Sequence, residues 1–279
     1  MGGEWDASIV LEYEKRVEPF TSLFVQDGLE PWLKTEAENG NGPSPPSLLD
    51  VGCGAGCGSL FALQAGWKVT ATDVSDAMVE RTQQRAMEKG CQDKIQCLVA
   101  DGQNLSSNPE ITKQQYQYVI AAFSLIFFPD PAKGLEEIYK CLATEGKVLV
   151  AAWGSPEQTP GFQIFPDAFR AVLEGQDAKP NRITGSPQVL RSLLKGANFR
   201  DIQIVGPISH SIHVASDEAY YDRFALTSPK IKTTLEGLEE EERTKVKAKV
   251  MELARERGGR PDGSISIPSM AYLAYATKR

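Results

Sequence analysis

The sequence has few of the residues that build metal sites or disulfide frameworks. It contains only two histidines, His210 and His213, and no further cysteine or histidine pair that would complete a zinc set with Cys53 and Cys57. Its five cysteines are an odd number in a chain of 279 residues, which favours free thiols in a reducing compartment. We therefore expect no metal, no disulfide framework and a cytoplasmic location.

Long basic and long apolar stretches are also missing. The formal net charge is −7, with no long run of Lys or Arg, which disfavours nucleic acid or an anionic membrane as a partner. No apolar stretch approaches the roughly 20 residues of a membrane-spanning helix. The opening MGGEWDAS has neither the positive nor the apolar region of a secretory leader. We expect no nucleic acid and no membrane insertion, and nothing here indicates an oligomeric state.

Short apolar runs alternate with amphipathic stretches through the middle of the chain. Strands are predicted at 48–51, 68–72, 95–99, 116–121 and 147–152, and helices at about 59–65, 76–89 and 131–142. Strand–helix alternation with short loops is typical of βαβ units. The pattern therefore predicts an α/β fold with a mainly parallel sheet covered by helices.

Helical segments are predicted on both sides of this core. One or two amphipathic helices, the second opened by Pro19, precede a Gly- and Pro-rich linker at 34–47. After the core, a helix follows Ser186 and a strand begins near Arg200, and the Glu and Lys residues beyond them are interpreted as a solvated helix face. The expected units are N-terminal helices and linker at 1–47, a core at 48–215, a helical insertion at 216–263 and a closing strand at 264–279.

A glycine-rich turn, LLDVGCGAGCGSL, joins the first predicted strand to the first predicted helix. Such a turn is a ligand site in open α/β folds, because glycines let backbone amides approach a ligand at a helix N-terminus. A phosphate loop is excluded because no Lys follows, and the dinucleotide fingerprint fails because no frame supplies its third glycine. What remains is the pattern Asp50-x-Gly52-x-Gly54-x-Gly56.

This pattern resembles motif I of the class I, Rossmann-like S-adenosylmethionine-dependent methyltransferases. An acid at the strand end suits the ammonium and sulfonium of S-adenosylmethionine (SAM), whereas it would repel a pyrophosphate. DVSDAM, ADGQN and AAFSLIFFPDP follow at matching spacings, so the resemblance covers residues 48–153. YEKRVEPFT and the closing SISIPSMAYLAYATKR resemble the ubiquinone/menaquinone-biosynthesis type of small-molecule methyltransferase.

The resemblance implies a doubly wound, seven-stranded sheet with N-terminal helices and a helical lid inserted between the last two strands. It also implies SAM as cofactor and S-adenosylhomocysteine as product. Asp73 would accept the ribose hydroxyls, and its alternative role as a helix cap competes weakly because Ser75 or Asp76 can cap that helix. The implied cofactor-binding residues are Tyr13, Thr21, Asp50, Gly52, Cys53, Gly54, Gly56, Asp73, Val74, Met78, Asp101, Gly102, Gln103, Ala122 and Phe123.

The acceptor is expected beyond the carboxyl ends of the fourth and fifth strands, where Phe123, Phe127, Phe128 and Trp153 line a pocket or pack in the core. Strong bases are scarce. The candidate catalytic residues are His210, Tyr221 and Ser124, each of which has an ordinary structural alternative.

The resemblance implies an in-line methyl transfer to a small-molecule acceptor. A scarcity of bases slightly favours a soft or pre-ionised nucleophile such as sulfur, with oxygen, nitrogen and carbon still open. Two other functions remain possible from the sequence. One is a SAM-binding regulatory protein without catalysis, and the other is a nucleotide-dependent oxidoreductase.

Overall fold

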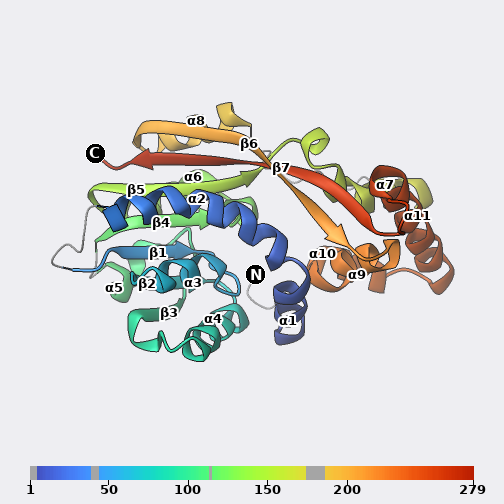
Figure 1. Ribbon diagram of the computed structural model, residues 1–279, viewed down its shortest axis with the longest axis horizontal. Helices are drawn as coiled ribbons and strands as arrows, with labels where there is room; N and C mark the ends of the chain where they lie inside the picture. Colours follow the sequence, from blue (N-terminus) through green and yellow to red (C-terminus); the bar gives the residue numbers. More distant parts are fainter. Residues whose placement is uncertain (1–4, 39–43, 113–114, 174–185) are drawn as a thin grey trace.

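A computed structural model describes residues 5–38, 44–112, 115–173 and 186–279 of the chain (Figure 1). Within these ranges seven strands form one sheet in the order β3-β2-β1-β4-β5-β7-β6. The strands are β1 (Ser47–Val51), β2 (Lys68–Asp73), β3 (Ile95–Val99), β4 (Tyr116–Ala122), β5 (Leu142–Trp153), β6 (Arg200–Val214) and β7 (Ile265–Thr277). The first five pair in parallel, whereas β7 is antiparallel to β5 and β6. The α/β class is confirmed, and the sheet is mixed.

Helices cover both faces of the sheet and also gather at one end of the molecule (Figure 1). The α-helices are α1 (Ala7–Arg16), α2 (Glu18–Glu38), α3 (Cys57–Gln64), α4 (Asp76–Glu88), α5 (Pro109–Thr112), α6 (Pro131–Cys141), α7 (Ile164–Val172), α8 (Pro187–Gly196), α9 (Asp217–Thr227), α10 (Pro229–Glu236) and α11 (Glu240–Gly258). Short 3-10 helices are η2 (Gln92–Lys94), η3 (Leu105–Ser107), η4 (Leu125–Phe127), η5 (Pro156–Gln158) and η6 (Pro160–Gln163). The elements predicted for the core occur in the predicted order, with shifted ends.

β1 lies at the centre of the parallel strands, because it pairs with β2 on one side and β4 on the other. Its side chains alternate between two apolar layers. Leu48 packs in the layer that contains α2 and α3, and Leu49 packs in the layer that contains α6 and α8. Strand order reverses between β1 and β4, which is the position at which open α/β sheets bind ligands at the carboxyl ends of their strands.

The start of the linker predicted at 34–47 is wrong. α2 continues to Glu38 through Pro31, and β1 already begins at Ser47. The helix continues because its inner face has partners: Trp32 packs on Tyr118 of β4 with ring centroids 4.8 Å apart, and the Tyr118 hydroxyl donates a hydrogen bond to Glu36. Tertiary contact therefore overrides the weak helix signal at the start of the polar stretch.

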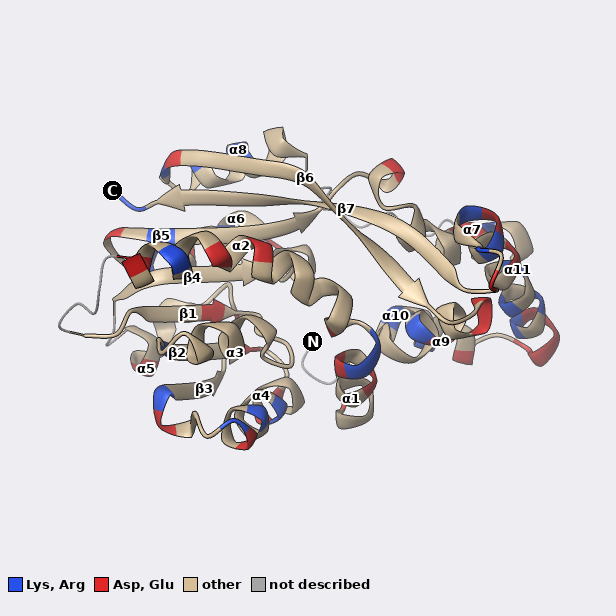
Figure 2. Cartoon of the chain, viewed as in Figure 1, with Lys and Arg blue, Asp and Glu red and all other residues tan. Residues whose placement is uncertain are grey.

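β6 and β7 extend well beyond the other strands and carry α9, α10 and α11 between them (Figure 1). β6 is longer than the sequence suggests, because it stays paired with β7 as far as Val214. On α11 the buried residues Val246, Val250 and Leu253 recur at helical spacing, while Figure 2 shows both signs of charge around the same helix.

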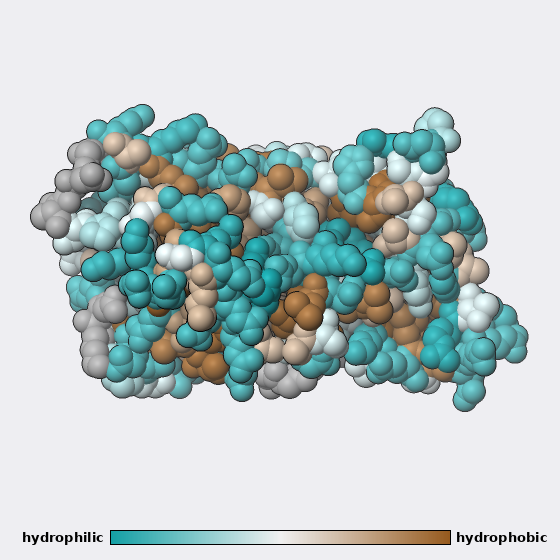
Figure 3. All heavy atoms as spheres, turned by 60° about the horizontal axis from the view of Figure 1, so that its bottom comes forward, coloured by the Kyte–Doolittle hydropathy of each residue, from teal (hydrophilic) through white to brown (hydrophobic). Residues whose placement is uncertain are grey.

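The molecular surface is largely hydrophilic on the face seen in Figure 3, with smaller hydrophobic areas between the polar groups. Among the helices of the described ranges, none is long and apolar enough to cross a bilayer.

Ile138→Ala on α6 and Met87→Ala on α4 are matched substitutions that test the packing of the sheet layers. Ile138 is 0% exposed and Met87 is 59% exposed. We expect Ile138→Ala to lower the free energy of unfolding by about 2–5 kcal/mol, because it leaves a cavity. Met87→Ala should change it by no more than about 0.5 kcal/mol. Urea denaturation measures both, and equal effects would contradict this packing of α6.

Candidate functional site

The glycine loop, residues 52–56, connects β1 to α3 and depends on backbone conformations that favour glycine. Gly52, Gly54 and Gly56 have φ of 72°, 56° and 93°. A Cβ atom at Gly52 would lie 2.4 Å from the Cβ of Ser124, and one at Gly56 would lie 2.8 Å from Cγ2 of Thr82. Close packing therefore requires glycine at positions 52 and 56, and the positive φ favours it at position 54.

The carboxylate of Asp73 ties the glycine loop to the end of β2. Its Oδ2 accepts a hydrogen bond from the amide of Gly54 at 3.0 Å, and its Oδ1 accepts one from the amide of Ser75 at 3.0 Å. Burial raises the pKa of Asp73, although these amides oppose the rise. Ser75 is the N-cap of α4, as its hydroxyl accepts from the Met78 amide. Ser75, and not Asp73, therefore caps α4.

Asp50 lies deeper than the expected contact with a ligand ammonium suggests. Its side chain accepts a hydrogen bond from Oγ of Ser59 on α3 at 2.7 Å, and the residue is 2% exposed. Burial raises the pKa of Asp50 to about 7, against the opposing effect of the Ser59 hydrogen bonds. The carboxyl therefore braces the loop from beneath.

The N-terminal helices lie over the glycine loop. The ring of Tyr13 on α1 comes within 3.9 Å of the place where a Cβ of Gly54 would stand. Burial raises the pKa of the Tyr13 hydroxyl well above its ordinary value, and the neighbouring Thr21 hydroxyl opposes the rise. Arg81 of α4 holds α1 by pairing with Glu14 at 2.6 Å. The structure thus brings Tyr13 and Thr21 together beside the loop.

The loops after β2 and β3 place the remaining predicted cofactor residues. Val74 is exposed, whereas Met78 is buried against α1. Asp101 accepts from the amide of Gln103 at 2.9 Å. Gln103 in turn accepts, through Oε1, from the amide of Asp130 at 2.7 Å, which links the loops after β3 and β4.

Gly102 and Cys53 are fixed by close packing. A Cβ at Gly102 would meet the ring of Phe128 at 2.2 Å. Cys53 is buried, and its sulfur lies 3.7 Å from the hydroxyl of Thr82. Burial raises the pKa of the Cys53 thiol well above its ordinary value, which keeps it neutral. All five cysteines are free thiols.

The end of β4 presents an unusual backbone and an unpartnered hydroxyl. Phe123, which follows Ala122, has φ of 58° although it is not glycine. The Ser124 hydroxyl is buried, and among the described residues it has no hydrogen-bond partner. It lies 3.1 Å from the place of a Cβ at Gly52, so an orphaned polar atom faces the glycine loop.

Three rings form an aromatic column between the end of β4 and α2. Trp153 is the ring that the other two share. Phe123 stacks on it with ring centroids 3.9 Å apart, and Phe20 stacks on it with ring centroids 5.7 Å apart and an interplanar angle of 3°. Phe24 touches Trp153 edge-on and also contacts His210 at 4.6 Å. Phe24 therefore connects the aromatic column to His210, one of the predicted catalytic residues.

The predicted catalytic residues His210 and Tyr221 lie in different parts of the molecule. His210 on β6 borders the column, and its Nε2 lies 2.7 Å from Oδ2 of Asp27. Tyr221 packs on Phe165 of α7 and lies beneath Lys247 of α11, so its observed partners belong to the helical end of the molecule. Phe127 is 60% exposed and contacts Trp5, which precedes α1.

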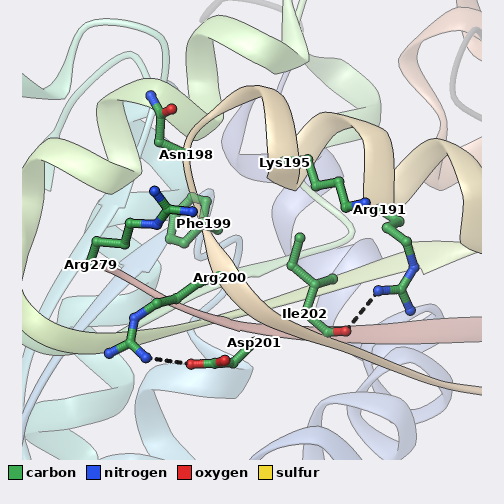
Figure 4. A pocket seen from close by; sticks show the side chains of 8 residues that line it. All are labelled: Arg191, Lys195, Asn198, Phe199, Arg200, Asp201, Ile202 and Arg279. Carbon is green, nitrogen blue, oxygen red and sulfur yellow. Dashed lines mark hydrogen bonds and ion pairs between the residues drawn. The ribbon is translucent and has the colours of Figure 1, made fainter.

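Two surface pockets lie at the end of the sheet where the parallel strands begin, opposite their carboxyl ends. The larger, of 340 Å³, is lined by residues at the start of β6, the end of α8 and Arg279, and Figure 4 shows its Arg and Lys side chains. The smaller, of 280 Å³, lies between the starts of β4 and β5. Neither includes a residue of the glycine loop. Among the described residues, no group of three or more His, Cys, Asp or Glu side chains could hold a metal ion.

Comparisons with known proteins agree with this fold. Residues 48–146, which contain the glycine loop, match the family model described as a methyltransferase domain. The demethylmenaquinone methyltransferase of Bacteroides fragilis is 24% identical over 175 residues, or 57% of this chain and 69% of that protein.

Solved structures share the fold. The YcgJ protein of Bacillus subtilis superposes with a TM-score of 0.56 at 19% identity, covering 91% of this chain and 99% of its own. A phosphoethanolamine N-methyltransferase of Haemonchus contortus, solved with S-adenosylhomocysteine, has a TM-score of 0.50 at 18% identity, covering 89% of this chain and 52% of its own.

Asp50→Asn tests the burial of the Asp50 carboxyl. Because the folded protein raises this pKa from 3.8 to about 7, the folded state holds the proton more tightly than the unfolded chain. The wild type therefore loses unfolding free energy as the pH rises from about 4 to 7. Asp50→Asn lacks this loss, so relative to wild type it should gain about 2–3 kcal/mol between about pH 5 and pH 7.

Urea denaturation at the two pH values measures this difference. Asp93→Asn, a change at an exposed carboxylate on η2, is the matched control and should follow the wild type. Parallel pH profiles for the wild type and Asp50→Asn would show that Asp50 is ionised in the folded protein across this range.

Proposed function

Because this chain is a class I SAM-dependent methyltransferase, we propose that it transfers the methyl group to a small, partly apolar acceptor bound against the aromatic column. The observation that carries the proposal is the stack of Phe123, Trp153 and Phe20 at the carboxyl ends of β4 and β5. In open α/β sheets this edge is where ligands bind.

The described residues fit SAM at the glycine loop. The three positive-φ glycines carry no side chain that would keep a ligand from the loop backbone, and the unpartnered Ser124 hydroxyl faces the same loop. We propose that Asp73 accepts the ribose hydroxyls, that Tyr13 and Thr21 contact the methionine part, and that Asp101 contacts the adenine. When bound, SAM supplies an activated methyl group, so the protein need not create a strong electrophile.

Further contacts to the cofactor follow from the same placement. We propose that the backbone of the glycine loop and of Gly102 and Gln103 approaches the ligand, and that Val74 and Met78 lie beside the adenine. Ala122 and Phe123 would border it at the end of β4. Asp50 and Cys53 would act from beneath the loop, since both are buried.

The chemistry that the chain adds is positioning in a water-poor site. Correct alignment of two reactants can contribute roughly 7–11 kcal/mol to a rate. The rings of the column exclude water. His210, held in place by Asp27, contacts Phe24, which packs edge-on against Trp153 of the column. A water-poor site with few bases favours a sulfur nucleophile, because sulfur needs little help from a base. His210 and Ser124 are the candidate residues to orient it, with Tyr221 acting from the helical end.

The helical segments at 1–47 and 216–263 are proposed to act as lids over a core formed by 48–215 and 264–279. α1 is held to α4 by Arg81 and to α9 by Arg223, which donates to the carbonyl oxygen of Arg16. Movement of α1 would therefore open both the cofactor side and the acceptor side. Such closure is a common way to exclude water during group transfer.

Asp73→Ala tests the cofactor site. We expect its affinity for SAM to fall by about 1–3 kcal/mol, because a buried carboxylate that meets hydrogen-bond donors is lost. Isothermal titration with SAM and S-adenosylhomocysteine measures the change, and Asp93→Ala is the matched control. Unchanged affinity in Asp73→Ala would place the cofactor elsewhere.

An acceptor series tests the proposed nucleophile. Thiophenol, phenol and aniline present sulfur, oxygen and nitrogen on the same ring. We expect S-adenosylhomocysteine to form at least about tenfold faster with thiophenol, because its low pKa supplies the nucleophile without a base. Release of S-adenosylhomocysteine, followed by chromatography, measures the rates. Turnover of phenol or aniline alone would overturn the sulfur preference while leaving methyl transfer intact.

A further inference from the structure

Arg223 on α9 is a buried cation without an acidic partner. It is 5% exposed, and among the described residues it makes no ion pair with a carboxylate. Other half-buried arginines of this region are paired: Arg81 with Glu14, and Arg85 with Glu18 at 2.7 Å. Burying a charge is costly unless it is paired, so an unpaired guanidinium calls for a physical reason.

The protein compensates Arg223 only in part. Its Nη1 donates to the carbonyl of Arg16, and its Nη2 donates to the carbonyl of Val17 at 3.5 Å. These carbonyls end α1, where the helix dipole is negative and suits a cation. A guanidinium has five N–H donors, however, and two neutral carbonyls do not balance its charge. Burial lowers the pKa of Arg223 to about 10, so the group remains charged at neutral pH.

The location of Arg223 supplies the reason. Its guanidinium carbon lies 5.5 Å from the centre of the Phe20 ring. Phe20 is the outer ring of the aromatic column, which leads through Trp153 to Phe123 at the end of β4. The unpaired cation therefore stands at the end of a stack of rings, on the β4 and β5 side of the crevice.

We propose that Arg223 binds a carboxylate-class anionic group of the methyl acceptor, whose planar apolar part lies against the aromatic column. This inference rests on the proposed function. Arginine is suited to the role, because its planar fork matches a carboxylate and stacks on aromatic rings. The carboxylate would complete the charge balance that the protein leaves open, and the acceptor would be held at both ends.

Binding of 2-naphthoate and of neutral 2-naphthamide to the protein saturated with S-adenosylhomocysteine tests the proposal without turnover. The two probes share a ring system and differ in charge. We expect 2-naphthoate to bind wild type at least about tenfold tighter than 2-naphthamide, as a charge-assisted bidentate contact requires. Isothermal titration calorimetry measures both. Equal binding, or no detectable binding of either probe, would overturn the proposal.

Two substitutions assign the preference to this residue. Arg223→Gln keeps N–H donors for the α1 carbonyls but removes the charge, so the preference for 2-naphthoate should disappear. Arg223→Lys keeps the charge and should retain part of it. Arg243→Met, at an exposed arginine of α11, is the matched control and should behave as wild type. A preference that survives in Arg223→Gln would overturn the proposal, and thermal unfolding of each variant verifies that it is folded.

The cofactor carries a carboxylate of its own, so its affinity is measured in the same variants. We expect the dissociation constant for S-adenosylhomocysteine in Arg223→Gln to stay within about threefold of wild type. A loss of tenfold or more would show that Arg223 holds the cofactor carboxylate and would overturn the acceptor assignment. Failure of the wild type to bind S-adenosylhomocysteine at all would instead refute the proposed cofactor site.

Discussion

The close approach of Gly52 to Ser124 is the constraint on which the site depends. The loops after β1 and β4 follow neighbouring strands, and they meet where the backbone of Gly52 lies against the side chain of Ser124. This contact fixes the position of the glycine loop relative to the end of β4. The cofactor side and the acceptor side of the crevice are therefore built on one short backbone junction.

Charge burial follows from this junction. Asp50 and Asp73 both lie close to the loop, and burial raises the pKa of each. Hydrogen bonds from Ser59, Gly54 and Ser75 hold these carboxyl groups in place. The site thus keeps two carboxyl groups in a low-dielectric setting, which strengthens their interaction with a cationic ligand. On the other side, Arg223 provides the opposite charge among rings.

The sequence predicts the order of the core elements and the glycine loop well, because both depend on local patterns. Alternating strands and helices identify the sheet, and the spacing from Asp50 to Gly56 identifies the loop. The antiparallel pairing of β7 and the length of β6 are not visible in such patterns, since they depend on which strands become neighbours. The extension of α2 is missed because its Trp32 and Glu36 are stabilised by Tyr118, a residue far away in the chain.

The acceptor side is harder to predict. Arg223 stands in a segment rich in charge, where arginine usually faces solvent, and only the packing of α9 against α1 shows that it is buried. Phe20 gives no local signal either, because its stacking on Trp153 joins residues far apart in the chain. The roles of His210, Tyr221 and Ser124 remain predictions, and the structure adds that His210 borders the aromatic column and Tyr221 does not contact it directly.

The long pairing of β6 with β7 extends the sheet and carries α9, α10 and α11 between its two strands. These strands pair with each other from Arg200 to Val214, with register shifts between Arg200 and Gln203 and between Val205 and Ile208, and the pairing is continuous from Ile208 onward. The connecting segment can thus vary in length and composition while the glycine loop keeps its geometry. This arrangement makes the enzyme modular: one sheet can serve many acceptors when the helical segment between its last two strands is exchanged.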